Sequence, residues 1–191
     1  ATPAAYAISR SSNYIRKTSK FLLITAALFP YVLLFLSLLE FARELGIGNN
    51  IFALSIPYSA LCMPLALLIL SASFEDLPLD LEEAARLEGL GLWKCLRLVL
   101  MPLISPSLAS TGILIFLFSW NEYPISLTWI SNQELITLPV AIARIAGSSL
   151  YSVPYGVYAA ATVLGALPLM LIVLLFQKQI ISGLTQGAIK G

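Results

Sequence analysis

Four long apolar runs restrict what this chain can fold into. They cover residues 21–39, 51–74, 98–121 and 155–176. A helix of about 20 residues is about 30 Å long, which matches the hydrocarbon core of a bilayer. Apolar residues make up 59% of the chain and charged residues only 11%, whereas soluble domains carry about 25% charged residues. We therefore expect an all-α polytopic membrane protein with four complete transmembrane helices.

The charged residues are concentrated between the second and third apolar runs. Of the 11 basic and 10 acidic residues, nine lie there: Glu75, Asp76, Asp80, Glu82, Glu83, Arg86, Glu88, Lys94 and Arg97. A charged side chain in hydrocarbon is costly unless it has a partner or a water-filled cavity. This charged segment is therefore expected to lie in water, beside the membrane.

Turn signals divide the charged segment into a helical hairpin. Asp80 is a good N-cap, and Glu83 three residues later completes a capping-box pattern. The first helix is expected to run to about Glu88 and to end at Gly89, because glycine adopts the left-handed C-terminal conformation without a Cβ clash. A second helix over residues 92–100 would follow, closed by a proline.

One face of the first hairpin helix is suited to docking. Leu81, Ala84, Ala85 and Glu88 recur at helical spacing, while Glu82 and Arg86 are placed to pair on another face. Small alanines allow a second backbone to approach closely, and the glutamates offer carboxylates to a basic partner. From residue types alone, a hairpin that only folds back under its own membrane domain is an equal alternative.

The hairpin also carries a spaced motif. Glu83-Ala84-Ala85, three residues, Gly89, nine residues and then Val99-Leu100-Met101-Pro102 resemble the EAA loop of ATP-binding cassette (ABC) importer permeases, EAA-x3-G-x9-I-x-L-P. Val99 and Met101 replace the usual isoleucine and leucine, and Glu88 replaces a common aspartate. The resemblance implies a cytoplasmic coupling loop over residues 78–102. Its expected contacts with an ATPase are Glu83, Ala84, Ala85, Glu88, Gly89 and Pro102.

The resemblance also implies partners and a location. They are two cytoplasmic ATPase subunits that bind ATP and Mg²⁺, a second permease subunit of different sequence, an extracytoplasmic solute-binding protein and membrane lipid. The chain would be a multi-pass protein of a bacterial inner membrane with a cytoplasmic C-terminus. It would itself be non-catalytic and would bind no cofactor.

The two ends of the chain also resemble segments of this permease family. Residues 183–191 resemble the C-terminus of carbohydrate-type, maltose-transporter-like permeases, which implies a sugar or sugar derivative as solute and ATPase contacts by Gln186, Gly187 and Lys190. Without the resemblance, a frayed glycine-rich end is the favoured interpretation. Residues 1–10 are similar to the inner end of a mid-chain transmembrane helix. We therefore expect residues 1–191 to form one permease domain that lacks its N-terminal spans.

The positive-inside rule gives the orientation. With the charged segment in the cytoplasm, only Arg43 and Arg144 among the basic residues lie outside. The basic residues then inside are Arg10, Arg16, Lys17, Lys20, Arg86, Lys94, Arg97, Lys178 and Lys190. Residues 131–154 would form an outer loop, which either contacts the solute-binding protein or is a passive re-entrant connector.

The triplet Trp120-Asn121-Glu122 ends the third apolar run. An acid at such depth predicts a place on a transport pathway, because a carboxylate is costly in lipid unless it faces a cavity or a partner. The alternative is that Glu122 simply reaches interfacial water. The resembled permeases often carry this triplet here, so Asn121 and Glu122 are candidate pathway residues.

Missing motifs narrow the classes of function. The sequence has no histidine and no phosphate-binding loop, so neither a histidine-based catalytic triad nor ATP binding by this chain is expected. Cys62 and Cys95 lack metal-site spacing, and a net charge of +1 argues against nucleic acid. An ion-coupled secondary transporter and a polytopic membrane enzyme remain as alternatives, although neither explains the spaced motif.

Overall fold

The computed structural model describes residues 1–146 and 154–186, without the side chains of residues 34–36, 146 and 178–186. In the described residues all regular structure is helical, which agrees with the expected fold class. The chain forms two compact units. One contains Ala1–Leu28, Met63–Ile115 and the segment from Phe176; the other contains Phe29–Cys62 and Phe116–Leu175.

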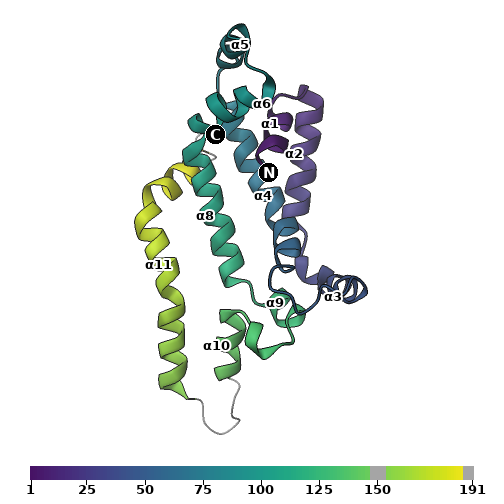
Figure 1. Cartoon of the computed structure of the whole chain (residues 1–191), viewed down its shortest axis with the longest axis vertical. Helices are drawn as coiled ribbons and strands as arrows, with labels where there is room; N and C mark the ends of the chain where they lie inside the picture. Colours follow the sequence, from purple (N-terminus) through teal and green to yellow (C-terminus); the bar gives the residue numbers. More distant parts are fainter. Residues whose placement is uncertain (147–153, 187–191) are drawn as a thin grey trace. The chain divides into compact units, whose positions relative to one another are not determined.

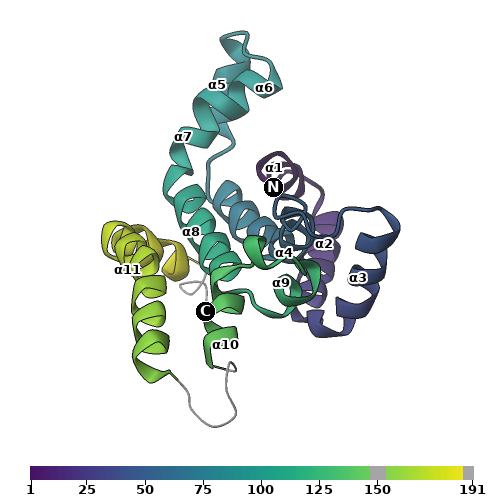
Figure 2. The same cartoon turned by 60° about the horizontal axis from the view of Figure 1, so that its bottom comes forward.

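The helices are labelled in chain order in Figure 1, apart from α7, which Figure 2 labels. They are α1 (Thr2–Ser9), α2 (Asn13–Leu28), α3 (Phe35–Glu44), α4 (Ser55–Glu75), α5 (Asp80–Leu87), α6 (Leu92–Cys95), α7 (Met101–Leu103), α8 (Ser105–Asn121), α9 (Pro124–Trp129), α10 (Leu138–Ala146) and α11 (Tyr155–Gln186). Shorter segments are the 3₁₀ turns η1 (Tyr31–Leu34) and η3 (Gln133–Leu135) and the π-helical η2 (Leu96–Leu100). In both views α1 lies beside α2 (Figure 2).

Two of the described helices are long and apolar enough to cross a membrane. They are α4 and the part of α11 over Tyr155–Gln177. A third span exists only as a bent pair, in which Leu92–Leu103 and Ser105–Asn121 meet at 79°. The described residues thus contain two spans, or three with the bent pair, rather than the four expected from the apolar runs.

The first apolar run, residues 21–39, does not form one helix. Instead α2 ends at Leu28, and η1 and α3 follow after Pro30. The ring of a proline disfavours the helical conformation of the preceding residue, and proline has no N–H to donate to the helix. The expectation of one continuous transmembrane helix over this run is therefore wrong.

Pro102 does not close the second hairpin helix, contrary to expectation. It lies inside α7, directly after η2. A helical proline removes one backbone hydrogen bond, and its ring crowds the carbonyl of the residue four positions earlier, which is Leu98. The wider π-helical turn of η2 accommodates this crowding. The chain therefore stays helical through Pro102 and bends at Ile104.

The predicted capping box at the start of α5 is also wrong. The N-cap residue is Leu79, which has helical dihedral angles of φ −65° and ψ −26°, and no side chain caps the helix. The Leu79 carbonyl accepts hydrogen bonds from the backbone N–H groups of Glu82 and Glu83. Asp80 is thus already helical, where its carboxylate complements the helix dipole rather than capping a free N–H.

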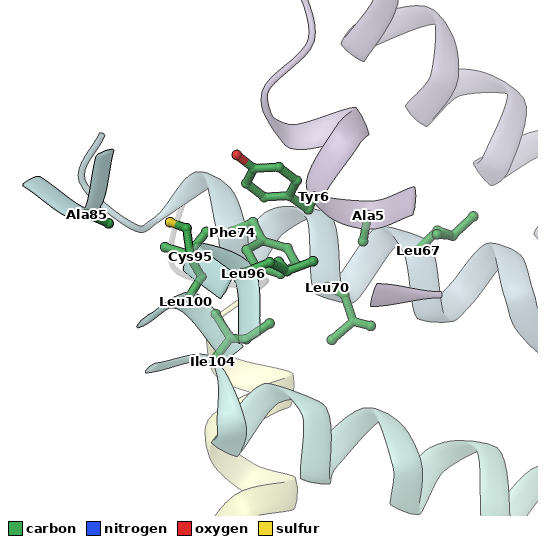
Figure 3. Packing of buried hydrophobic residues seen from close by; sticks show 10 residues of the cluster. All are labelled: Ala5, Tyr6, Leu67, Leu70, Phe74, Ala85, Cys95, Leu96, Leu100 and Ile104. Atoms are coloured by element: carbon green, nitrogen blue, oxygen red, sulfur yellow. The ribbon is translucent and has the colours of Figure 1, made fainter. Parts of the chain in front are cut away.

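The first unit has an apolar core that joins α1, α4, α5 and the segment from α6 to Ile104. Its members are Ala5, Tyr6, Leu67, Leu70, Phe74, Ala85, Cys95, Leu96, Leu100 and Ile104 (Figure 3). Tyr6 and Phe74 meet edge to face, with ring centroids 5.5 Å apart. Such aromatic pairs add to the free energy of apolar burial. The core therefore holds the short helix α1 against α4.

The second unit has a smaller core built by α3, the start of α4, and α9. Its buried residues are Ala42, Leu54, Ile125, Trp129 and Ile130. Asn49, which has a φ of +59°, links the loop between α3 and α4 to the end of α9 and the residues that follow it. The Asn49 backbone N–H donates to the Trp129 carbonyl over 3.0 Å, and its side-chain oxygen accepts from the N–H of Asn132, also over 3.0 Å. Asparagine tolerates this left-handed conformation better than most residues.

Candidate functional site

Helix α5 presents a continuous exposed face. Glu83, Ala84, Leu87 and Glu88 are exposed, and Leu87 is 90% exposed. These positions lie on one side of a helix because they are one, four and five residues apart. The face combines an apolar centre with two carboxylates, so it can bind a partner that offers an apolar groove and a basic or hydrogen-bonding group.

The exposed face is not the one that the sequence predicted. Ala85 is buried in the core with Cys95 and Leu96, and Leu81 is half-buried. Of the predicted docking face, Ala84 and Glu88 remain exposed. The small Ala85 side chain allows α5 to lie close to the second helix of its own hairpin. Helical spacing in the sequence does not distinguish an alanine that packs inside the hairpin from one that docks on a partner.

Gly89 ends α5 as the sequence predicted. Its φ of +78° lies in the left-handed region. The Gly89 N–H donates to the Arg86 carbonyl over 2.9 Å, and the Leu90 N–H donates to the Ala85 carbonyl over 3.0 Å. These two bonds form a Schellman motif. The prediction of a glycine C-terminal turn is confirmed.

Glu82 lies on the opposite side of α5 and is only 4% exposed. Its Oε1 accepts a hydrogen bond from Arg10 Nε over 2.6 Å, and its Oε2 accepts from the Tyr6 hydroxyl over 2.7 Å. Arg10 also donates from Nη2 to the Leu77 carbonyl over 3.2 Å. The expected pairing of Glu82 with Arg86 is replaced by these contacts, which no local sequence signal predicts because Arg10 lies 72 residues away.

Tyr6 contributes both its ring and its hydroxyl to this cluster. The ring is packed in the apolar core of the first unit, and the hydroxyl donates to the Glu82 carboxylate. A second ion pair nearby, between Lys20 Nζ and Glu75 Oε2 over 2.8 Å, links α2 to the end of α4.

Glu122 lies in the second unit and is also only 4% exposed. Its Oε1 accepts from the backbone N–H of Ile125 over 2.8 Å, and its Oε2 accepts from the Ser126 N–H over 3.0 Å and from the Tyr58 hydroxyl over 2.8 Å. These bonds cap the N-terminus of α9. The alternative in which Glu122 reaches interfacial water is wrong, whereas a pathway role stays a prediction.

The other two residues of the triplet line a cavity of about 420 Å³ in the second unit. Trp120 Nε1 donates to the Gly165 carbonyl over 3.2 Å, and Asn121 Nδ2 donates to the Leu117 carbonyl over 2.8 Å. The lining residues are Trp120, Asn121, Tyr123, Leu138, Pro139, Ile142, Ala143, Tyr158, Thr162, Gly165, Ala166 and Leu169. The cavity is lined by aromatic, aliphatic and neutral polar groups.

The predicted tail contacts fall largely beyond the described part of the chain. Gly187 and Lys190 lie outside it, and Gln186 is described only as the last backbone position of α11. The predicted outer loop is described over residues 131–146, where it forms η3 and α10. Among the described residues, no group of three or more His, Cys, Asp or Glu side chains is placed to hold a metal ion.

The apolar spans, together with a short, exposed helix on a glycine-ended hairpin, are the features of a multi-pass membrane protein. The sequence family described as "Binding-protein-dependent transport system inner membrane component" matches residues 1–186. The chain belongs to this family.

Individual relatives match nearly the whole chain. The trehalose transport system permease protein SugB of Mycobacterium tuberculosis (strain CDC 1551 / Oshkosh) is 39% identical over 98% of the chain and 69% of its own length. The trehalose/maltose transport system permease protein MalG of Thermococcus litoralis (strain ATCC 51850 / DSM 5473 / JCM 8560 / NS-C) is 39% identical over 98% of the chain and 67% of its own length.

A solved structure has a similar fold. It is the crystal structure of a bacterial ABC transporter involved in the import of the acidic polysaccharide alginate, with a TM-score of 0.75 and 25% identity. The match covers 93% of this chain and 66% of the solved chain. This chain therefore spans about two thirds of the length of its relatives.

Proposed function

We propose that this chain is a permease subunit of a binding-protein-dependent ABC importer and forms part of the path for a sugar or sugar derivative. The observation that carries the proposal is the 39% identity to a trehalose permease protein over 98% of the chain. The second relative is named for trehalose and maltose, and the similar structure for a polysaccharide. Family membership favours this function over an ion-coupled secondary transporter.

The exposed face of α5 is proposed to dock on an ATPase subunit. Leu87 would enter an apolar groove, and Glu83 would be held by a basic or hydrogen-bonding group of the ATPase. Gly89 supports this arrangement because its left-handed turn allows α5 to project from the hairpin. Closure of the ATPase pair on ATP and Mg²⁺ would then move α5 and change the access of the path between the two sides of the membrane.

Family membership supports the proposal of the remaining partners. A second permease subunit would complete the path, and an extracytoplasmic protein would deliver the solute to the outer loop. This chain would be non-catalytic, with ATP hydrolysis performed by the partners. It would reside in a bacterial inner membrane with its C-terminus in the cytoplasm, where Gln186, Gly187 and Lys190 would reach the ATPases.

Charge reversal at Glu83 tests the coupling role. A charge-assisted hydrogen bond contributes about 1.5–3 kcal/mol, so Glu83→Lys should weaken ATPase docking by about tenfold or more. Uptake of radiolabelled trehalose or maltose by cells carrying the complete transporter should fall accordingly, while the amount of inserted permease stays the same. A bulky residue at Gly89 should have a similar effect.

Glu44→Lys is the matched control, because Glu44 is an exposed acid outside the coupling hairpin. Uptake should be unchanged in this variant. Normal uptake in both Glu83→Lys and the Gly89 variant would refute the coupling role. Purification of the wild-type permease in mild detergent without any bound ATPase would refute the importer assignment itself and favour a secondary transporter.

A further inference from the structure

The buried contacts of Glu82 connect two helices that are far apart in sequence. Tyr6 and Arg10 belong to α1 and its C-terminal end, and they lie 76 and 72 residues from Glu82. Both carboxylate oxygens of Glu82 are engaged, one by a charged donor and one by a neutral donor. The arrangement therefore fixes the direction of the Glu82 side chain, as well as neutralising its charge.

Arg10 holds the connection between α4 and α5 as well. Its Nη2 donates to the Leu77 carbonyl, in the linker just after α4, while its Nε binds Glu82 at the start of α5. One guanidinium group thus fixes both ends of the short linker that contains Pro78. Because guanidinium is planar and rigid, it restricts the angle between its two acceptors.

Glu82 and Glu83 have opposite surroundings although they are neighbours. Successive residues of a helix point about 100° apart, so Glu82 is directed into the first unit while Glu83 is exposed on the outer face of α5. A partner that binds the outer face and moves α5 must therefore also move Glu82. A buried ion pair transmits such movement well because breaking it leaves an unpaired buried charge.

We propose that Glu82, held by Arg10 and Tyr6, is a positioning residue that transmits movement of the coupling helix α5 to α1. This inference rests on the proposed function, because it assumes that an ATPase moves α5. Apolar contacts of Ala85 press α5 against its hairpin partner, and the Glu82 contacts tie it to the N-terminal helix. The ion pair and the Tyr6 hydrogen bond thus add a directional polar link between α5 and α1 to the apolar core that both helices share.

The first test uses the permease in its membrane and requires no partner. Cys95 is buried beneath α5 in the same cluster as Ala85 (Figure 3). In a Cys62→Ala background, the rate of Cys95 alkylation by N-ethylmaleimide reports how often α5 lifts from the core. We expect Glu82→Gln and Arg10→Gln each to raise this rate about tenfold, which corresponds to about 1.4 kcal/mol.

Matched controls separate this effect from a simple change of charge. Asp80→Asn removes an exposed carboxylate from the same helix, and Lys17→Gln removes an exposed cation from α2. Asp80→Asn should raise the rate only about twofold, through the lost helix-dipole interaction, and Lys17→Gln should leave it unchanged. Arg10→Gln retains the Glu82 carboxylate, so faster alkylation in this variant does not result from the loss of that carboxylate and reports exposure of Cys95. Wild-type rates in both Glu82→Gln and Arg10→Gln would overturn the positioning role.

The second test measures transport by the complete complex in proteoliposomes. The readout is the amount of sugar taken up per ATP hydrolysed, which a loss of folded protein alone does not change. Arg10→Gln should lower this ratio about tenfold, and Arg10→Lys should restore part of it. An unchanged ratio in assembled Arg10→Gln complexes would overturn the proposal.

Tyr6→Phe tests the proposal if the Arg10 variants do not assemble with their partners. It keeps the ring that packs on Phe74 and removes only the hydroxyl donor, so the ratio should fall while assembly persists. Tyr14→Phe is the control, since Tyr14 is exposed. An unchanged ratio in Tyr6→Phe would then overturn the proposal. Wild-type permease that purifies without an ATPase would refute the proposed function instead and would not affect the alkylation result.

Discussion

Glu122 illustrates how a buried acid is tolerated within an apolar chain. Its carboxylate accepts three hydrogen bonds, two from the first turn of α9 and one from Tyr58 of α4. The N-terminal end of a helix favours negative charge, and the three donors replace the water that burial removes. The sequence indicates that this acid needs a partner, but it gives no sign of which one, because Tyr58 lies 64 residues away.

Glu122→Ala should destabilise the protein by about 2–4 kcal/mol, because three buried donors lose their acceptor. Thermal unfolding of the purified permease in detergent measures this as a lower midpoint temperature. Glu134→Ala is the control, since its side chain is exposed, and it should change the midpoint little. Equal midpoints for the two variants would show that the Glu122 contacts do not stabilise the second unit.

At the scale of elements, some properties of helix α5 can be predicted from the sequence and others cannot. Helical spacing and a following glycine predicted a short helix that ends at a left-handed turn, and both features are local. The inward face of α5 depends on Cys95, Arg10 and Tyr6, which reach it only after the chain has folded. The start of the helix was mispredicted because Leu79 already adopts helical dihedral angles.

Gly89→Ala should destabilise the hairpin by about 1–2 kcal/mol, which is the cost of a side chain in the left-handed conformation. Apart from the adjoining residues, no atom lies within 4 Å of the added Cβ, so the effect arises from the backbone conformation rather than from a clash with the rest of the chain. Gly91→Ala is the matched control: Gly91 has φ −69° and equally open surroundings. It should be neutral or slightly stabilising. Equal effects in thermal unfolding would contradict the left-handed turn.

Elements of the membrane region show the same division. Apolar runs predicted α4 and α11 because their composition alone selects a helix in lipid. The break of the first run at Pro30, and the π-helical turn just before Pro102, depend on which groups form hydrogen bonds with the backbone groups that each proline leaves without a partner. Hydropathy does not contain that information. It predicts one helix over residues 21–39, where the chain forms parts of three helical segments.

At the scale of the whole molecule, much of the apolar surface requires an environment outside the chain. Helix α11 is long and apolar, yet most of its described side chains are exposed. Exposed apolar area of this extent is stable only against lipid or another protein. This agrees with membership of an inner membrane component family, because a bilayer covers apolar surface of this kind.

The orientation predicted from the basic residues can be measured with two cysteines. Phe52 and Leu87 are 84% and 90% exposed, and α4 is the span that separates them in sequence. The positive-inside rule places Leu87 in the cytoplasm and Phe52 outside. In a background without Cys62 and Cys95, a membrane-impermeant maleimide should label Phe52→Cys in spheroplasts and Leu87→Cys in inverted vesicles. Labelling of both positions from one side would mean that α4 does not cross the membrane, and the reverse pattern would place α5 beyond the reach of any cytoplasmic ATPase.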